Sequence, residues 1–304
     1  MSEPEILIQP RGRLANQMFQ MIIALQIQKR AGGGRIVGYN MPEWKLVSPP
    51  VQQRQRRALV LSRHIFDLDN AAFMLKSSLM DTIIVNGWGM RMPNFGAPAF
   101  YRSLFQSSLA GEAVADDELL IHIRGEDVLS GWHRRYFPMP FSFYEEVIGL
   151  TGLRPVFMGQ IGEDNYSIGL RRRFPDARYL PLRSVIADFT TIRNAANVVL
   201  SVSSFSWLAT WLSQKAVNIH LPVAGLFDPL NNETSLLPVG DRRYTFYKMS
   251  MPDLEARKQL NFMQWAEAHP FEGILETDDI RKLFVTLMGE MRPVPGNVFD
   301  RSSS

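Results

Sequence analysis

Short apolar runs alternate with longer amphipathic stretches through the second half of this 304-residue chain. Such alternation is typical of repeated βαβ units and a parallel sheet. It predicts strands at residues 119–124, 156–158, 178–180, 198–202 and 217–221. Helices are predicted between these strands, at residues 142–150, 165–174, 185–196 and 204–213. We therefore expect the second half to be a five-stranded Rossmann-like domain of the α/β class.

The first half begins in the same way and then loses the pattern. An apolar run at residues 6–8 leads through Gly12 into a helix predicted at residues 16–30, which ends at the glycines 32–34. Further strands are predicted at residues 36–38 and 82–85, and helices near residues 253–269 and 277–291. The predicted division is an N-terminal Rossmann-like domain (1–114), a C-terminal Rossmann-like domain (115–245), and terminal helices that pack back on the body (246–304).

Composition excludes several kinds of chemistry. The chain has no cysteine, so it can form no disulfide, thiolate metal site or cysteine nucleophile. No apolar run reaches the roughly 20 residues that span a bilayer, and we expect a soluble, cytoplasmic protein for which peripheral membrane contact stays open. The net charge of +3 includes arginine-rich runs at 54–57 and 171–173, which we interpret as solvated faces. Nucleic-acid binding is not expected.

Two segments that follow predicted strands contain residues that could bind an anionic ligand. Residues 12–20, Gly-Arg-Leu-Ala-Asn-Gln-Met-Phe-Gln, form a turn into a helix, where a glycine lets the backbone approach a ligand closely. The alternative is that Gly12 only makes the turn and Asn16 caps the helix. In residues 121–127, Ile-His-Ile-Arg-Gly-Glu-Asp, Arg124 follows a strand and offers a fork of donors that suits phosphate. Alternatively, Arg124 pairs with Glu126 or Asp127 within the loop, and His122 is expected to be a hydrogen-bonded structural histidine.

A third segment, residues 203–212, opens a helix with hydroxyl groups. Ser203 and Ser204 could form an anion site with the helix N-terminus, or could serve only as N-caps. Trp207, Leu208, Trp211 and Leu212 recur at helical spacing and are expected in the core. The pair Asp67 and Asp69 matches a metal-binding pattern too short to be specific, and no metal is expected. Phosphate-loop, nucleophile-elbow and dinucleotide-binding motifs are absent.

Taken in this order, the three segments resemble the motifs of the α-1,2-fucosyltransferase family, within the wider superfamily that includes protein O-fucosyltransferases. Residues 12–20 resemble Gly-x-Leu-Gly-Asn-Gln-Met-Phe-Gln, residues 122–127 resemble His-x-Arg-Arg-Gly-Asp, and residues 203–212 resemble Ser-Ser-Phe-Ser-Trp-x-Ala-x-Trp-Leu. The resemblance implies a GT-B-like fold of two Rossmann-like domains with the active site in the cleft between them, where residues 1–114 form the acceptor-side domain and residues 115–245 form the domain that binds the GDP-sugar donor. It also implies an inverting fucosyltransferase with GDP-fucose as donor substrate, a glycan acceptor, and no cofactor or catalytic metal.

The resemblance assigns roles to individual residues. Arg124 matches the arginine at the donor diphosphate, and Asp127 is the first candidate for the general base, with Glu126 and His133 as alternatives. The donor-binding set that it implies is Gly12, Arg13, Asn16, His122, Arg124, Asp188, Ser203, Ser204 and Phe205. Within this set Asn16 and the backbone near Gly12 face donor and acceptor, and Asp188 matches an acid near the nucleoside. Acceptor contacts are expected near Trp44, Trp88, Trp132 and Tyr136, each of which could equally be core.

Three departures from the family pattern keep other functions open. Ala15 replaces the second loop glycine, Gly125 replaces a second arginine, and Glu126 occupies the position of a glycine. A transferase that uses another GDP-sugar is one alternative. A nucleotide- or glycan-binding protein without turnover is another, and a metal-dependent transferase centred on Asp67 and Asp69 is the third.

Overall fold

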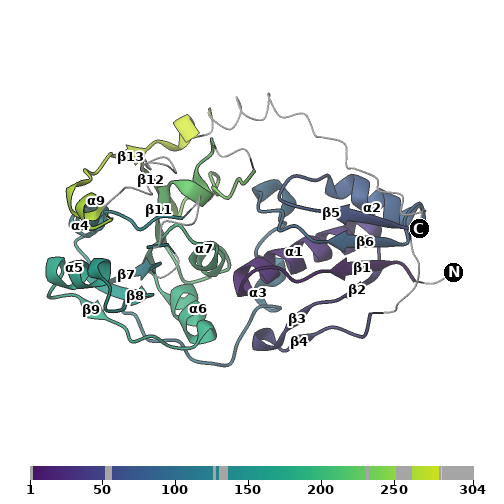
Figure 1. Cartoon of the computed structure of the whole chain (residues 1–304), viewed down its shortest axis with the longest axis horizontal. Helices are drawn as coiled ribbons and strands as arrows, with labels where there is room; N and C mark the ends of the chain where they lie inside the picture. The colour runs from purple at the N-terminus through teal and green to yellow at the C-terminus, as the bar shows by residue number, and fades with distance from the viewer. Residues whose placement is uncertain are drawn as a thin grey trace. The chain divides into compact units, whose positions relative to one another are not determined.

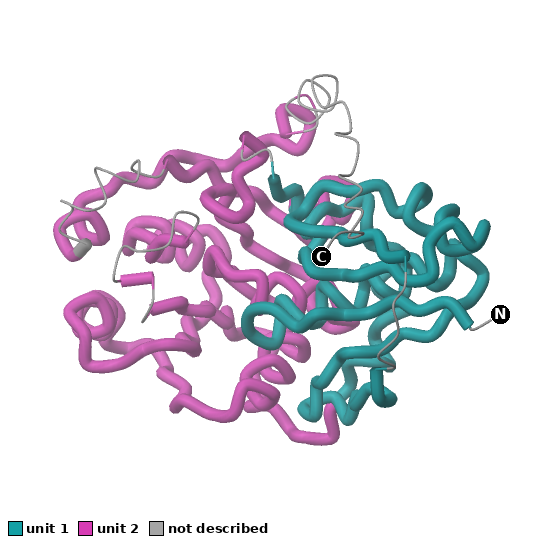
Figure 2. The backbone as a smooth tube through the Cα atoms, turned by 45° about the vertical axis from the view of Figure 1, so that its right-hand side comes forward, with its two compact units in different colours: residues 1–106, 232–236, 286–304 teal, residues 107–231, 237–285 magenta. Residues whose placement is uncertain are grey.

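The computed structural model describes residues 3–51, 57–125, 128–129, 136–230, 233–250, 262–280 and 282. The chain forms two compact units, which Figure 2 distinguishes by colour. Unit 1 comprises residues 1–106, 232–236 and 286–304, and unit 2 comprises residues 107–231 and 237–285. Each unit contains a parallel sheet with helices packed on it. The predicted α/β class with two Rossmann-like halves is therefore confirmed.

Unit 1 is built on a four-stranded parallel sheet in the order β2-β1-β6-β5. Its strands are β1 (Glu5–Ile8), β2 (Arg35–Val37), β5 (Ala58–Leu61) and β6 (Thr82–Val85), and its longer helices are α1 (Leu14–Ala31) and α2 (Leu68–Lys76). The crossovers β1-α1-β2 and β5-α2-β6 run in the same direction across the sheet, so right-handed connections place both helices on one face. The two helices pack against each other accordingly (Figure 1). Shorter elements are β3 (Asn40–Met41), η1 (Pro42–Trp44), β4 (Leu46–Val47), η2 (Met92–Asn94) and α3 (Ala99–Arg102).

Helix α1 begins earlier than the sequence predicts. Its N-cap is Arg13, whose side chain makes no capping bond, and Asn16 is the third residue of the helix. The amide of Asn16 donates to the Arg13 carbonyl at 2.9 Å. The prediction that Asn16 caps the helix is therefore wrong. The C-terminal glycine prediction is confirmed, because Gly32 adopts a left-handed conformation with φ of 77° and ends the helix.

Unit 2 contains a seven-stranded sheet in the order β13-β12-β11-β10-β7-β8-β9. The strands are β7 (Glu118–Ile123), β8 (Arg154–Gly159), β9 (Arg178–Tyr179), β10 (Asn197–Val199), β11 (Asn218–Val223), β12 (Tyr244–Lys248) and β13 (Ile274–Leu275). Only the β12–β13 pair is antiparallel within this sheet. The five predicted strands are all present, whereas β12 and β13 were not predicted. Strand β12 also runs across the boundary predicted between residues 245 and 246.

The helices of unit 2 divide between the two faces of the sheet. They are α4 (Phe141–Thr151), α5 (Asn165–Arg173), α6 (Val185–Asn194), α7 (Ser204–Trp211), η3 (Gly225–Phe227) and α9 (Phe262–Ala268). From β7 the chain moves outward through β8 and β9, and then returns to β10 on the other side of β7. Helices α4 and α5 contact α9, and α6 contacts α7. The direction of the connections reverses between β7 and β10, and because right-handed crossovers change face when they change direction, α4 and α5 lie on one face and α6 and α7 on the other.

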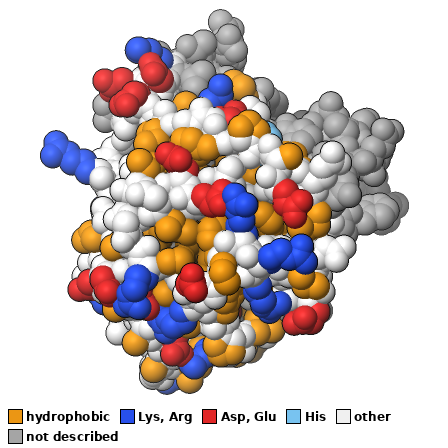
Figure 3. Space-filling view, turned by 90° about the vertical axis from the view of Figure 1, so that its left-hand side faces the viewer, with side chains coloured by type: hydrophobic (Ala, Val, Ile, Leu, Met, Phe, Trp, Pro, Cys, Tyr) orange, Lys and Arg blue, Asp and Glu red, His pale blue; other side chains and the backbone are white. Residues whose placement is uncertain are grey.

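Core and surface agree with the patterning of the sequence. Trp207, Leu208 and Leu212 are fully buried, and the rings of Trp207 and Trp211 stack at 5.6 Å, which confirms their core assignment. On the surface shown in Figure 3, charged side chains of both signs are interspersed with hydrophobic ones. Arg171 and Arg173 pair with Glu163 and Glu145, as a solvated face would. Within the described part of the chain, no helix is long and apolar enough to cross a membrane.

Candidate functional site

The reversal of strand order in unit 2 brings two of the three sequence segments together. Strands β7 and β10 are parallel neighbours, with Val199 opposite Ile121. Arg124 directly follows β7, and Ser203 and Ser204 begin the helix that follows β10. In open parallel sheets, ligands bind at the carboxyl ends of the strands where the connections leave to opposite faces. We call this edge of unit 2, with Arg124 on one strand and Ser203 and Ser204 beyond the other, the switch point.

Arg124 is held against an aromatic ring. It is half-buried, and its guanidinium carbon lies 3.8 Å from the centroid of the Tyr136 ring. At this distance the cation is attracted by the negative face of the ring. Glu126 and Asp127, the alternative partners of Arg124, and His133 lie outside the described residues. Their proposed roles as general base stay predictions.

His122 links the two sides of the switch point. Its Nδ1 lies 2.7 Å from the Ser201 hydroxyl, and its ring lies 6.2 Å from that of Phe205. Burial, and to a smaller extent the positive charge of Arg124, lowers the pKa of His122 to about 3. The ring is therefore neutral at physiological pH. The expectation of a hydrogen-bonded structural histidine is confirmed, and a neutral ring adds no positive charge to the site.

The N-terminus of α7 supplies hydroxyl and amide groups to the same edge. Ser203 is the N-cap, and its hydroxyl accepts the Phe205 amide at 3.3 Å. Ser204 is the first helical residue, and both serines are buried. The capping alternative is therefore observed for Ser203. It does not oppose anion binding, because the positive end of the helix dipole still lies at the carboxyl edge.

Asp188 lies in the first turn of α6, the helix that packs against α7. Its neighbour Phe189 makes an edge contact with Phe205, with ring centroids 5.4 Å apart. Partial burial raises the pKa of Asp188 to about 6, against the opposing charge of Arg183. A carboxylate so placed would repel a phosphate, but it could accept N–H groups of a nucleobase. This chemistry agrees with the nucleoside role that the resemblance implies for Asp188.

The position of Gly125, which matches an arginine in the fucosyltransferase motif, has little space for a side chain. A Cβ atom at this position would lie 2.5 Å from the backbone carbonyl oxygen of Gln160. The Gln160 amide donates to the Ile123 carbonyl at 3.0 Å, which holds the ends of β7 and β8 close together. A side chain at residue 125 would have to push these strand ends apart. Any residue larger than glycine is therefore disfavoured at position 125, and Arg124 is the arginine of this segment.

In unit 1 a fully buried glutamine organises the corresponding sheet edge. Gln20 of α1 donates to the carbonyls of Gln9 (2.8 Å) and Val85 (3.2 Å), which follow β1 and end β6. Its Oε1 accepts the Arg11 amide at 3.0 Å. One side chain thus fixes both strand ends and the start of the Gly12 turn. This role of Gln20 was not predicted, although a polar residue between Phe19 and Met21 in an apolar run is a usable signal.

Gly12 and Asn16 are packed against each other within that turn. Gly12 has φ of 75°, and a Cβ there would lie 2.2 Å from the Asn16 side-chain nitrogen. The Asn16 Oδ1 is buried and has no hydrogen-bond partner among the described residues. Arg13 is exposed. These three residues belong to unit 1, whereas Arg124, His122, Asp188 and the serines belong to unit 2.

The carboxylates of Asp67 and Asp69 have ordinary structural roles. The Asp67 Oδ1 accepts the amides of Asp69 (2.9 Å) and Asn70 (3.0 Å) as the N-cap of α2. Asp69 forms an ion pair with Arg30 at 3.1 Å. Where the structure describes the chain, no group of three or more His, Asp or Glu side chains is arranged to hold a metal ion.

The aromatic candidates for acceptor binding differ in their surroundings. Trp44 is buried with its ring 5.9 Å from Phe105, so its alternative assignment to the core is confirmed. Trp88 is half-buried and donates its indole N–H to the Arg11 carbonyl at 3.2 Å, beside the Gly12 turn. One face of Tyr136 is covered by Arg124. Trp132 lies outside the described residues.

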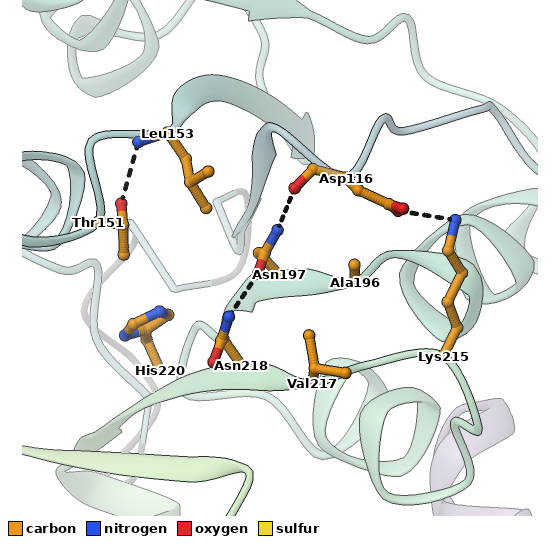
Figure 4. Close-up of a pocket in the computed structure, with 9 residues that line it drawn as sticks. All are labelled: Asp116, Thr151, Leu153, Ala196, Asn197, Lys215, Val217, Asn218 and His220. Atoms are coloured by element: carbon orange, nitrogen blue, oxygen red, sulfur yellow. Dashed lines mark hydrogen bonds and ion pairs between the residues drawn. The ribbon is translucent and has the colours of Figure 1, made fainter.

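A cavity of about 580 Å³ lies at the opposite, amino-terminal edge of the unit 2 sheet (Figure 4). Most of the polar side chains that line the cavity form hydrogen bonds or ion pairs with one another. Asn218 donates to the Asn197 side chain at 2.7 Å, and Asn197 donates to the Asp116 carbonyl at 2.9 Å. Lys215 pairs with the Asp116 carboxylate at 3.3 Å. None of the predicted site residues lines this cavity.

The chain has a fold-level likeness to a known protein but no match at the level of sequence families. No protein-family model matches the sequence, and no curated protein matches it. Among solved structures the chain is similar to the iron-containing dodecameric glycosyltransferase TibC from enterotoxigenic E. coli, with a TM-score of 0.42 and 13% sequence identity. The match covers 95% of this chain and 76% of that chain. A likeness of this degree does not identify an activity for this chain.

Proposed function

We propose that this protein is an inverting glycosyltransferase that binds a nucleoside diphosphate sugar at the switch point of unit 2. The observation that carries the proposal is the placement of Arg124 and the N-terminus of α7 on adjacent strand ends, at the edge where parallel sheets bind ligands. The resemblance of the three sequence segments favours GDP-fucose as donor and a glycan hydroxyl as acceptor. The soluble, cytoplasmic assignment is part of the same proposal.

In this proposal the chain stabilises the leaving diphosphate without a metal ion. As the bond to the sugar breaks, negative charge grows on the diphosphate oxygens and must be stabilised. Arg124 would donate two parallel N–H groups to them, and the dipole of α7 would add a second positive contribution. A base takes the proton of the acceptor hydroxyl, and Asp127 remains our first candidate for it.

The donor base would be recognised on the α6 side of the site. The half-buried Asp188 can accept two N–H groups, which guanine offers and uracil does not offer in the same pattern. This favours a GDP-sugar over a UDP-sugar but does not distinguish fucose from another sugar. A second candidate function, nucleotide binding without turnover, is favoured by Gly125, because one arginine stabilises a developing charge less than two would.

A thermal-shift panel with GDP, GDP-fucose, GDP-mannose and UDP-sugars tests the proposal. A ligand at 100 times its dissociation constant stabilises a protein by about 2.7 kcal/mol, which is easily detected. We expect a shift with GDP compounds that persists in EDTA and is lost in Arg124→Ala. Arg154→Ala is the matched control, since Arg154 is exposed at the amino-terminal edge and pairs with Asp117. Absence of any shift with GDP compounds would refute the proposal.

Donor hydrolysis then separates the two candidate functions. A transferase that binds GDP-fucose should release GDP slowly even without an acceptor, and Arg124→Lys should recover little of this activity because a point charge cannot copy the fork. Loss of a charge-stabilising group costs about 3–4 kcal/mol of barrier, a fall of a hundredfold or more. Binding without hydrolysis, or transfer to no glycan, would favour a binding protein.

A further inference from the structure

We propose that Tyr136 is a positioning residue, which holds the guanidinium of Arg124 in the orientation that binds the donor phosphates. The inference rests on the proposed function, because it concerns how the same site grips its ligand. It starts from two observations in unit 2. The Arg124 guanidinium carbon lies 3.8 Å from the Tyr136 ring centroid, and the neighbouring residue is Gly125, which contributes no side chain.

The geometry of stacking suits phosphate recognition. A guanidinium group is planar, and its N–H donors point outward in that plane. An aromatic ring that covers one face restricts rotation of the group without occupying those in-plane directions. Tyr136 can therefore fix the direction of the Arg124 donors while a phosphate binds along their edge.

The surroundings of Arg124 explain why such a support is needed. Arg124 follows the last paired residue of β7, so the ladder no longer orients it. The carbonyl of Gln160 excludes any side chain at residue 125, so a second arginine cannot share the diphosphate there. With a single arginine in the segment, affinity depends more on how well that one group is pre-oriented. This also revises the role of Tyr136, whose covered face is unavailable to a sugar ring.

The test compares GDP with guanosine in binding titrations of Tyr136→Leu and Tyr136→Phe. A cation–π contact is worth about 2- to 30-fold in affinity, and we expect Tyr136→Leu to lose that much for GDP and nothing for guanosine. Tyr136→Phe keeps the ring and should stay within about twofold of the parent. Tyr179→Leu is the matched control, because Tyr179 is a half-buried tyrosine that stacks on Phe157 away from the site.

A ligand-independent measurement separates this inference from the proposed function. Stacking on Tyr136 should shift the Arg124 Nε–H proton upfield in the NMR spectrum, and Tyr136→Leu should abolish that shift. Equal losses for GDP and guanosine, or unchanged GDP affinity in Tyr136→Leu, would overturn the positioning role. Failure of the parent protein to bind GDP at all would instead refute the proposed function, whereas an upfield shift that is lost in Tyr136→Leu would still show that Tyr136 orients Arg124.

Discussion

Replacing Gly125 by alanine should destabilise the protein, although alanine is the smallest possible change. The added Cβ would lie 2.5 Å from the Gln160 carbonyl oxygen, whereas real Cβ atoms essentially never come within 3.0 Å of another heavy atom. The obstacle is a backbone atom just beyond the carboxyl ends of two paired strands, so no side-chain rotation can relieve it. The strand ends of β7 and β8 must separate by about half an ångström.

The expected cost follows from the contacts that must change. Overpacking a well-packed site costs about 1–3 kcal/mol. Stretching the bond from the Gln160 amide to the Ile123 carbonyl costs up to about 1 kcal/mol more. Alanine returns about 0.4–1 kcal/mol by restricting the unfolded chain. We therefore expect the free energy of unfolding to fall by about 1–3 kcal/mol in Gly125→Ala.

Urea denaturation followed by circular dichroism measures this change, with separate fits if the two units unfold separately. Gly149→Ala is the matched control. Gly149 lies inside α4 with no atom within 4 Å of an added Cβ, so alanine there should raise stability by up to about 1 kcal/mol. The two substitutions add the same methyl group and should act with opposite signs.

A Gly125→Ala variant as stable as the parent would refute this reasoning. It would mean that the strand ends yield easily and that the steric account of the missing arginine is wrong. In that case Gly125→Arg should be tolerated and should tighten GDP binding. Our expectation is the reverse, namely that Gly125→Arg is destabilised at least as much as Gly125→Ala and gains no affinity.

Three further predictions address other parts of the site. Because the raised pKa of Asp188 makes the folded state hold a proton that the unfolded state has released, stability should fall as pH rises from about 4 to 6. The free energy of unfolding of Asp188→Asn should therefore exceed that of the parent by about 1 kcal/mol at pH 7, after allowance for partial exposure. Urea midpoints should show no gain below pH 4, and the affinity of this variant for GDP should fall. Gln20→Leu removes the side-chain partner of the Gln9 carbonyl and the Arg11 amide, whereas the Val85 carbonyl keeps the Gln9 amide, and it should cost about 2–4 kcal/mol, measured by the same midpoints. Gly12→Ala should cost at least 1 kcal/mol because φ is positive and Asn16 fills the space, and thermal denaturation would show it.

Sequence periodicity predicted most of the fold for an identifiable reason. Strands buried on both faces of a parallel sheet are continuous apolar runs, and every residue of β7 is buried. The missed strand β12 has the sequence Tyr-Thr-Phe-Tyr-Lys, which is rich in strand-forming residues, but turn-forming residues surround it. Strand β5 follows a stretch rich in Gln and Arg and was missed for the same reason. Local composition hid both strands, and only pairing with β11 and β6 shows them.

The site was predictable where it depends on strand ends and hidden where it depends on distant neighbours. The position of Arg124 after an apolar run was enough to place it at the ligand edge. No local pattern could show that the carbonyl of Gln160, just after β8, disfavours a side chain at residue 125, or that Tyr136 stacks on Arg124 across an intervening segment. Long-range contacts of this kind leave no periodic signal in a single sequence.

The three sequence segments do not all lie in the same unit of the structure. Two of them meet within unit 2, where the His122–Ser201 hydrogen bond joins the end of β7 to the residues just before α7. The third is held in unit 1 by Gln20 and belongs to a separate sheet. If the donor phosphates bind at the switch point, substitutions at Arg124 must weaken binding of GDP alone. Substitutions at Asn16, which belongs to unit 1, should then leave the affinity for GDP alone unchanged, and GDP titrations of variants at the two positions would test this.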